Sequence, residues 1–401
     1  MEQTLKGPTI GQYTLSSPLL VAPMAGVADA PFREICREFG AGLSTSEMLT
    51  SDINIWHHPK SQWRLKWAHN ETPVSVQIAG TEPDLMARAA EECQKLGAQI
   101  IDINMGCPAK KVCKKYAGSA LMEQEKLVGD IVSAVVAAVD CPVTVKTRTG
   151  SQLDKKNAVI IAQICEDAGA SAVAIHGRTR ACKFQGTAEH FTVAEVKRSI
   201  NIPVFANGDI ISPNEAKCIL DETGVDGIMI GRAALGRPWI FRQINEYLAE
   251  GRISFAPSVR DKQKVIERHL RAIHQFYGVN TGVRIARKHV LWYMEHLPSS
   301  DAFTKQFVRV STCEEQSQLL NDYFENSKLE EEVLNLAETI ASKSNKVVKI
   351  GKRAFYKQLE MPLDEAYKYT SKIMTENMMA LDAKEGISAF LEKRTPNWKN
   401  K

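Results

Sequence analysis

Several features that mark particular protein classes are missing from this sequence. Its apolar stretches are short runs, far from the ~20 consecutive apolar residues that a membrane-spanning helix needs. The first residues also lack the basic segment followed by an apolar segment that a secretory signal peptide has. We therefore expect a cytoplasmic protein with no membrane partner.

The cysteines and the net charge exclude further classes. Nine cysteines are scattered without the paired spacing of a zinc site or of a secreted disulfide framework. Reduced thiols and no metal site are therefore expected. A formal net charge of +4 permits an anionic partner but does not require one. The apolar content of 44% and the charged content of 24% are typical of a folded globular protein.

One unit recurs from residue 19 to residue 234: a short β-branched run that ends in Gly, Asn or Pro, followed by a longer amphipathic stretch. The runs are residues 19–26, 41–48, 73–80, 100–108, 142–150, 171–179, 202–210 and 227–234. Between them, stretches such as 84–98 and 214–224 have the apolar periodicity of helices. Eight alternating units predict an α/β fold, a (β/α)8 TIM barrel. A doubly wound open sheet is the alternative, but no G-x-G-x-x-G follows the first run.

The barrel accounts for only part of the chain. We expect a catalytic barrel domain at 1–250 and a linker at 252–258. An all-helical domain is expected at 258–326, because this stretch has helical patterns and few strand signals. A separately patterned helical extension is expected at 327–401.

Candidate ligand-binding residues stand where the predicted strands end. The carboxyl ends of the strands form the active-site mouth of such a barrel. Polar residues end nearly all of the runs, and together they predict one large polar pocket. Asn207, Gly208, Asp209, Gly231 and Arg232 follow the last two strands, where barrels commonly bind a phosphate through exposed backbone N–H groups. Each glycine alone could equally serve a tight turn.

Lys146 ends an apolar strand, so its ammonium needs an anionic partner in the pocket. A reduced flavin provides such a partner, and then Gln77 can bind the ring edge while Pro23, Met24 and Ala25 lie against the ring. A sugar phosphate would satisfy Lys146 as well. His176 ends another strand two residues before Arg178, a pair that suits a phosphate or a base carbonyl.

Cys107 stands between Gly106 and Pro108, directly after the fourth predicted strand. A buried cysteine is usually a small apolar residue. A metal role with Cys113 is disfavoured, because no second Cys or His pair completes a ligand set. A loop thiol with a pKa of about 8.5 is mostly protonated at neutral pH, so it can act as a general acid. The lysines at 110, 111, 114 and 115 suit a polyanion or a solvated surface.

These motifs resemble those of a known family. Residues 23–33 (PMAGVADAPFR), 102–112 (DINMGCPAKKV), 144–150 (TVKTRTG), 176–180 (HGRTR) and 229–241 (MIGRAALGRPWIF) look like those of the tRNA-dihydrouridine synthases, most closely the bacterial B subgroup. The likeness runs from about residue 10 to residue 326, with the motifs in order and at the expected spacing.

The resemblance implies an FMN enzyme that uses NADPH to reduce a D-loop uridine of tRNA to 5,6-dihydrouridine. Hydride would pass from flavin N5 to C6 of uracil, and Cys107 would give the proton to C5. By motif position, the residues that would hold FMN are Pro23, Met24, Ala25, Gln77, Lys146, Asn207, Gly208, Asp209, Gly231 and Arg232. Asn104, His176 and Arg178 match positions that line the flavin and substrate pocket.

The helical domain would then grip the tRNA. Arg284, Arg287 and Lys288 are spaced i, i+3 and i+4, so they share one helix face. A solvated face is the alternative. Residues 327–401 depart from the family and resemble the C-terminal helices of the enoyl-CoA hydratase/isomerase (crotonase) family, without its CoA pocket.

Two other functions stay open at this point. A flavin barrel acting on a small free pyrimidine would need no helical platform with a cationic face. A tRNA-binding protein without activity would need neither Cys107 nor the flavin-pocket residues.

Overall fold

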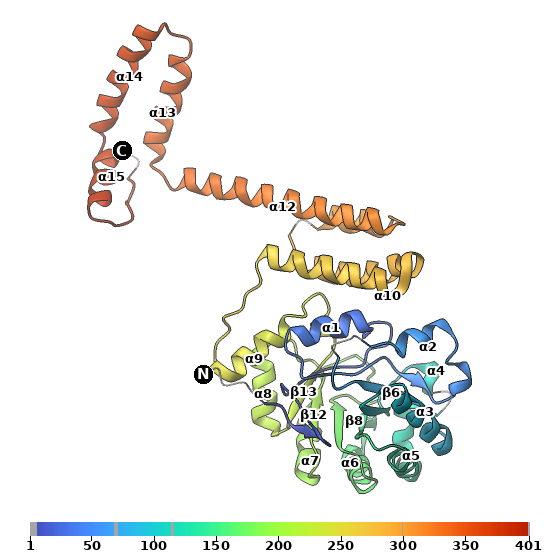
Figure 1. The fold of residues 1–401 in the computed structure, drawn as a ribbon. Helices are drawn as coiled ribbons and strands as arrows, with labels where there is room; N and C mark the ends of the chain where they lie inside the picture. Colours follow the sequence, from blue (N-terminus) through green and yellow to red (C-terminus); the bar gives the residue numbers. More distant parts are fainter. Residues whose placement is uncertain (1–5, 68–70, 114–115, 299, 400–401) are drawn as a thin grey trace. The chain divides into compact units, whose positions relative to one another are not determined.

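The structure is a computed structural model that describes residues 6–67, 71–113, 116–298 and 300–399. Within these residues, nine parallel strand segments form one curled sheet (Figure 1). In hydrogen-bonding order they are β4 (Leu43–Ser44), β3 (Leu19–Val21), β13 (Gly227–Ile230), β12 (Val204–Asn207), β11 (Ala172–His176), β8 (Val143–Arg148), β7 (Ile100–Asn104), β6 (Ser75–Ala79) and β5 (Leu49–Thr50).

The two ends of this order belong to one stretch of chain, residues 43–50, and this closes the sheet. β4 pairs with β3 and β5 pairs with β6, while a bridge between Thr45 and Ser75 joins the gap. The Ser46 backbone N–H donates to Ser75 O at 3.0 Å, and Ser46 Oγ then accepts the Gln77 backbone N–H at 3.1 Å in place of a backbone carbonyl. The predicted run at 41–48 is thus two short segments, and the prediction of an eight-stranded α/β barrel is confirmed.

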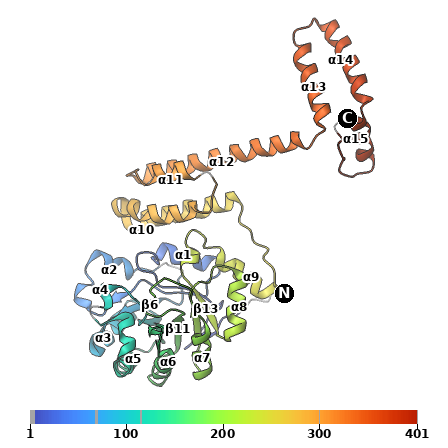
Figure 2. The same ribbon diagram turned by 180° about the vertical axis from the view of Figure 1, so that it is seen from behind.

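Helices cover the outside of the barrel (Figures 1 and 2). They are α1 (Ala30–Glu38), α2 (Pro59–Arg64), α3 (Pro83–Lys95), α4 (Lys110–Cys113), α5 (Glu125–Ala138), α6 (Ala158–Asp167), α7 (Phe191–Ser199), α8 (Pro213–Thr223) and α9 (Ile240–Glu250). Short 3-10 helices are η1 (Ile53–Ile55), η2 (Gly118–Glu123) and η3 (Arg232–Ala234). Two hairpins, β1 (Thr9–Ile10) with β2 (Tyr13–Thr14) and β9 (Gly150–Gln152) with β10 (Lys155–Lys156), lie outside the main sheet.

The predicted helices at 84–98 and 214–224 correspond to α3 and α8. α8 shows why the sequence starts and stops a helix there. Ser212 Oγ accepts the backbone N–H of Glu215, Pro213 occupies the first turn, and Gly224 ends the helix with φ 66°. Gly is favoured at such an end, because a side chain strains the left-handed conformation.

Alternation along the strands separates two cores. Side chains such as Ile101, Ile103 and Val145 point outward and pack under the helices. A smaller inner core includes Leu20, Phe205 and Met229 and fills the barrel interior. Asp102, Asn104 and Lys146 share the inward alternation, so polar side chains collect above this inner core.

Residues 252–257 form no helix or strand and lead to α10 (Val259–Met294) and α11 (Asp301–Phe307). A capping box between Ser258 and Asp261 starts α10. Gly278, with φ 74° and ψ 173°, breaks α10 into two helical parts. α10 is attached to the barrel, since Tyr277 Oη donates to Asp29 Oδ2 at 3.0 Å and Lys288 Nζ donates to Gly26 O.

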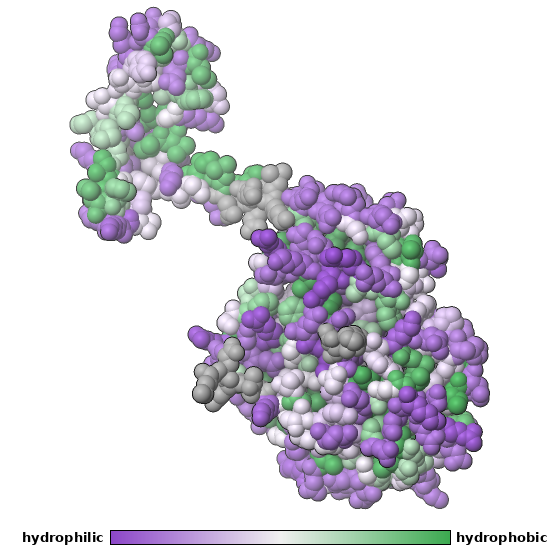
Figure 3. Space-filling model, viewed as in Figure 1, coloured by the Kyte–Doolittle hydropathy of each residue, from purple (hydrophilic) through white to green (hydrophobic). Residues whose placement is uncertain are grey.

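The chain divides into two compact units, residues 1–317 and 318–401. α12 (Cys313–Ala341) runs through both this boundary and the predicted one at 326/327, so the three-domain division stays a prediction. The second unit also contains α13 (Asn345–Gln358), α14 (Leu363–Met378) and α15 (Leu381–Leu391). On the face drawn in Figure 3, hydrophobic and hydrophilic side chains of this unit are both exposed. Among the described residues, no helix is long and apolar enough to cross a membrane.

Candidate active site

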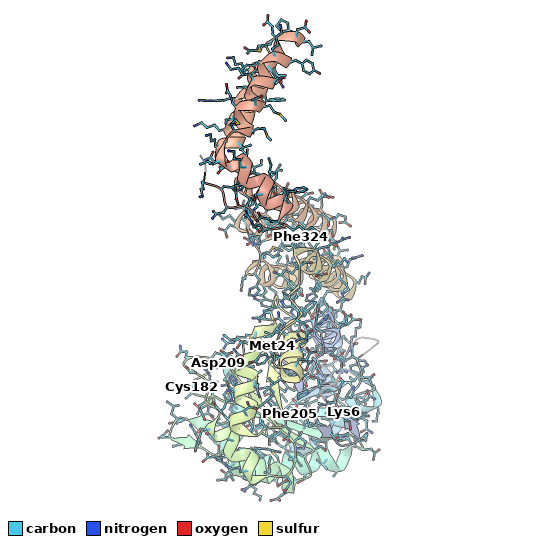
Figure 4. The ribbon with its side chains drawn as sticks, turned by 90° about the vertical axis from the view of Figure 1, so that its left-hand side faces the viewer. Lys6, Met24, Cys182, Phe205, Asp209 and Phe324 are labelled. Carbon is cyan, nitrogen blue, oxygen red and sulfur yellow. The ribbon has the colours of Figure 1, made fainter. Side chains whose placement is uncertain are left out.

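A cavity of about 970 Å³ opens at the carboxyl ends of the barrel strands. Most of the predicted pocket residues line it, and they come from the carboxyl ends of the strands and from the loops that follow them. They are Pro23, Met24, Ala25, Gln77, Asn104, Cys107, Lys146, His176, Asn207, Gly208, Asp209, Gly231 and Arg232. Met24 and Asp209, labelled in Figure 4, both lie at this end of the barrel.

A chain of hydrogen bonds runs across the cavity floor to the Cys107 loop. Asp102 Oδ2 accepts from Gln77 Nε2 at 2.6 Å, and Gln77 Oε1 accepts from Asn104 Nδ2 at 2.7 Å. Asn104 Oδ1 then accepts the backbone N–H of Cys107 at 3.0 Å. Because a carboxylate can only accept, Asp102 fixes which way both amides point. The Asp102 carboxylate thereby orients Asn104 so that its Oδ1 accepts the backbone N–H of Cys107.

Burial gives Asp102 an unusual proton affinity. Its side chain is 3% exposed, and this burial raises its pKa from 3.8 to about 6, against the lowering effect of hydrogen bonds from Thr144 and Gln77. Thr144 Oγ1 donates to Asp102 Oδ1 at 2.6 Å. Both oxygens therefore accept from neighbours, which is the arrangement of an ionised carboxylate at neutral pH.

The Cys107 thiol is half-buried at the cavity wall, and burial raises its pKa above the usual value. The backbone carbonyl oxygen of Cys107 accepts hydrogen bonds from Ser119 Oγ at 2.9 Å and from the Ser119 backbone N–H at 3.1 Å. The loop is thus fixed from two sides, by Asn104 and by Ser119. A thiol with a raised pKa keeps its proton at neutral pH, so Cys107 can act as an acid.

Lys146 is buried in the cavity floor. Its Nζ donates to Asn207 Oδ1 at 3.0 Å, across the small Ala174 of the intervening strand β11. Burial, with a smaller effect of Arg148, lowers its pKa from 10.5 to about 8. Asn207 is itself fixed, because its Nδ2 donates to Met229 O at 2.7 Å. Lys146 therefore remains a positioned cation at neutral pH with capacity for further hydrogen bonds.

His176 faces the cavity as a neutral imidazole. Burial and then the charges of Lys146 and Arg148 lower its pKa to about 2. A neutral imidazole can donate from one nitrogen and accept at the other.

Arg178 does not line the cavity, although the sequence predicted a substrate contact. Its Nη1 and Nη2 donate to the two carboxylate oxygens of Asp209 at 3.0 and 2.6 Å. The remaining N–H groups face His176 Nε2 and the carbonyl oxygens of Gln185 and Gly186. The geometry therefore favours a positioning role, in which Arg178 holds the Asp209 turn.

The turns after β12 and β13 are shaped by their glycines. A Cβ at Gly208, where φ is 119°, would come within 2.8 Å of Ala188 Cβ and 2.9 Å of the His176 ring. A Cβ at Gly231 would meet nothing closer than 3.5 Å, so its backbone lies open to the cavity. The carboxylate of Asp209 is held by Arg178 and, at 3.3 Å, by Arg232. Because this carboxylate is anionic, the backbone N–H of Asp209 suits a phosphate and its side chain does not.

Arg148 and Phe184 also line the cavity. Arg148 is one of the polar residues that end the predicted runs, but neither residue was assigned a ligand contact. Arg148 Nε donates to Gly106 O at 2.6 Å, and its guanidinium lies 5.5 Å from the Phe184 ring centroid. The sequence contained a signal for Arg148 and Asp102, because both continue the inward alternation of Asn104 and Lys146. Phe184 lies in a loop and has no comparable signal.

The three predicted tRNA contacts on α10 differ in their surroundings. Arg284 is exposed, whereas Arg287 Nη2 donates to Val310 O at 3.0 Å and Lys288 Nζ donates to Gly26 O. Two of the three cations thus stabilise the helical region and its attachment to the barrel. Arg284 remains the clearest candidate for a solvent-side ligand.

The predicted lysines beside Cys107 lie outside what the structure describes: the side chains of 110 and 111, and residues 114 and 115 entirely. Among the described residues, no group of three or more His, Cys, Asp or Glu side chains could hold a metal ion.

Comparisons with known proteins give two regions of likeness. The sequence model of the dihydrouridine synthase (Dus) family matches residues 20–328, and that of the enoyl-CoA hydratase/isomerase family matches residues 313–401. The chain is 52% identical over 315 residues to tRNA-dihydrouridine synthase B of Pseudomonas aeruginosa, which covers 79% of this chain and 95% of that protein. It is 50% identical over 317 residues to the protein of the same name from Vibrio cholerae, which covers 79% and 98%.

A solved structure, the old yellow enzyme homologue from Zymomonas mobilis, matches with a TM-score of 0.46 and 14% identity over 65% of this chain and 96% of that one.

Proposed function

This chain belongs to the dihydrouridine synthase family, and we propose that it reduces a uridine of the tRNA D-loop to 5,6-dihydrouridine with FMN and NADPH. The observation that carries this proposal is the chain of hydrogen bonds from Asp102 through Gln77 and Asn104. It holds the loop of a protonated Cys107 at the wall of a cavity of about 970 Å³. A cavity of that size suits a flavin with a base beside it.

The residues of the cavity fit FMN. Lys146 is a buried cation with one neutral partner, so it can meet the negative charge of a reduced flavin ring. The open backbone at Gly231 and the turn at Gly208 suit the phosphate, with Arg232 beside them. We assign flavin contacts to Pro23, Met24, Ala25, Gln77, Lys146, Asn207, Gly208, Asp209, Gly231 and Arg232.

A bound FMN, reduced by NADPH, would supply a hydride to C6 of the uracil ring. Cys107 would then give its proton to C5, where the negative charge would develop. Its raised pKa keeps that proton available at neutral pH. The neutral His176 can donate a hydrogen bond to a base carbonyl without adding a full charge.

The target base must leave its stack to enter the cavity, and loop RNA lowers that cost of a few kcal/mol. We propose that residues 1–250 carry the chemistry, that residues 258–326 bind tRNA with Arg284 as a contact, and that 327–401 form an extension. Arg287 and Lys288 support this region through their contacts with Val310 and Gly26.

The test is mass spectrometry of unmodified tRNA after incubation with the purified protein and NADPH. Dihydrouridine in the tRNA is the expected result. If the flavin-loaded protein oxidised NADPH but reduced only small free pyrimidines such as uracil, the tRNA assignment would be wrong. Absence of bound flavin together with retained tRNA binding would favour a binding protein without this activity.

A further inference from the structure

Helix α13 in the second unit carries charge of one sign. Its 14 residues contain five cationic side chains and no acidic one, namely Lys346, Lys349, Lys352, Arg353 and Lys357. The neighbouring α14 has three acidic and two basic side chains, and α15 has two acidic and one basic. The cationic character is therefore confined to α13 within this bundle.

The cations of α13 share one side of the helix. Lys346, Lys349, Arg353 and Lys357 follow one another at three- or four-residue steps, so they form a row along the helix. Lys352 and Tyr356 flank that row. All five cations are exposed, and the Tyr356 side chain is 61% exposed. Four of the five cations, all except Lys346, line a shallow hollow of about 510 Å³ together with Tyr356 and Glu360.

The opposite side of α13 holds the helix in place. Val347, Val348 and Ile350 are half-buried and Ala354 is buried, and α14 and α15 pack against α13 within the unit. Among the described residues none of the five cations forms an ion pair, while Lys357 Nζ lies 5.0 Å from the Tyr369 ring centroid. The cationic row is thus presented to solvent by a helix that packs Val347, Val348, Ile350 and Ala354 within the unit and leaves Phe355 54% exposed.

Two helices carry a larger net positive charge than the whole chain does. α10 has eight cationic and two acidic residues, a net charge of +6, and α13 has a net charge of +5. Because the whole chain is only +4, all other residues together carry −7. From this distribution we propose that the cationic row of α13, with Tyr356, is a second docking surface for the phosphate backbone of tRNA.

RNA fits this surface better than other anions of the same charge. A row of cations along a helix matches successive phosphates of a nucleic-acid strand, and an exposed tyrosine among them can stack on an unpaired base. An anionic lipid surface would instead need free apolar side chains beside the cations. The row of cations and the exposed Tyr356 favour RNA. Phe355 of α13, 54% exposed, is the side chain that a lipid surface would use, so vesicle binding is measured beside RNA binding. The identity of that RNA as tRNA rests on the proposed function.

The test compares two triple variants of the full, flavin-loaded chain. Lys349→Gln/Lys352→Gln/Arg353→Gln removes two charges of the row and the flanking Lys352, and Lys368→Gln/Lys372→Gln/Lys384→Gln removes three exposed charges from α14 and α15. Binding of unmodified tRNA is measured by filter retention at several salt concentrations, and circular dichroism verifies that helix content is kept. Both variants lose the same net charge, so a difference in their tRNA affinities shows that the position of the removed charges matters.

We expect the α13 variant to bind tRNA about tenfold more weakly and to lower the slope of log Kd against log salt by about two to three, relative to the control variant. Equal affinities and slopes for the two variants would overturn the proposal. So would unchanged tRNA binding in an α13 variant that no longer sediments with phosphatidylserine vesicles, because the surface would then serve a membrane. If the unsubstituted protein binds tRNA but forms no dihydrouridine, the proposed function is wrong. The tRNA affinities of the two triple variants then still test whether α13 is a docking surface.

Discussion

The barrel mouth and the C-terminal unit have opposite surfaces. In the mouth, polar side chains are buried: Gln77 is 1% exposed and Asp102 3%. In residues 318–401, large apolar side chains are exposed, with Leu363 at 73% and Phe390 at 83%. The mouth buries groups that prefer water, and the C-terminal unit exposes groups that avoid it.

The difference shows where the structure is organised for chemistry. Burying a carboxylate and an ammonium is costly unless each is hydrogen-bonded, and each of these groups has fixed partners. Such a network keeps its geometry when a ligand enters. The C-terminal unit buries few large apolar side chains, so packing contributes less to its stability. We therefore expect single contacts to matter in the mouth and collective charge to matter in the helices.

The largest expected effect is the loss of the acid. In Cys107→Ala, tRNA reduction should fall by about 10² or more, the usual contribution of a positioned acid, while flavin content and NADPH oxidation persist. Cys113→Ala is the matched control, because its thiol, at the end of α4, lies 3.5 Å from Cys107 O. Single-turnover dihydrouridine formation measures both. Unchanged turnover in Cys107→Ala would show that Cys107 is not the acid. It would also contradict the expectation that single contacts matter in the barrel mouth.

Asp102→Asn should have the next largest effect. An asparagine can present an N–H toward Gln77, which would turn the amides of Gln77 and Asn104 and release the Cys107 backbone. We expect kcat for dihydrouridine formation to fall about tenfold or more, with KM for tRNA little changed. Thr144→Val is the control, because it removes the other hydrogen bond to Asp102 and leaves the amides fixed. Equal losses in the two variants would mean that general packing, and not amide orientation, is responsible.

Hydrogen exchange compares the two regions without any substitution. Amides of β7 and β8 should exchange close to the rate set by global unfolding, whereas those of α13, α14 and α15 should exchange faster by orders of magnitude, because fewer large side chains are buried there. Exchange followed by mass spectrometry resolves these segments. Equal protection in both regions would show that the C-terminal unit is as stable as the barrel.

The titration of Asp102 gives a smaller effect with a defined sign. Its folded pKa of about 6 is above its ordinary value of 3.8, so the folded protein holds this proton more tightly than the unfolded chain. The resulting stability is fully present below pH 3.8 and is lost as the pH rises through about 6. The shift corresponds to about 3 kcal/mol. Urea unfolding between pH 4 and 7 should therefore show a steeper decline for the natural protein than for Asp102→Asn, and parallel curves would contradict the assignment.

The smallest effect is expected at an exposed helix position. Arg284→Glu should weaken tRNA binding a few-fold and leave flavin content and the unfolding midpoint unchanged, since Arg284 is exposed. Arg260→Glu, on the first part of α10, is a charge-matched control. Titration of labelled tRNA gives the two affinities. If Arg260→Glu weakened binding as much, net charge would explain the result and the position of Arg284 would not.

Much of the site could be read from the sequence. Polar residues placed after regular apolar runs identified the residues around one cavity, because parallel strands bring their carboxyl ends to the same edge. The alternation also contained Asp102 and Arg148, which point inward with Asn104 and Lys146. The sequence did not predict the hydrogen-bond partner of each side chain. Arg178 faces Asp209 instead of the cavity, and Arg287 and Lys288 bind protein carbonyl oxygens.

The sequence by itself determined the barrel, its family and the cysteine at its mouth, since local periodicity and motif order depend on neighbouring residues alone. Only the tertiary structure decided the partners. Lys146 and Asn207 meet across 61 positions, Gln77 and Asp102 across 25, and burial then sets their proton affinities. Hydrogen bonds between distant residues depend on how strands and loops pack, and no local pattern specifies that.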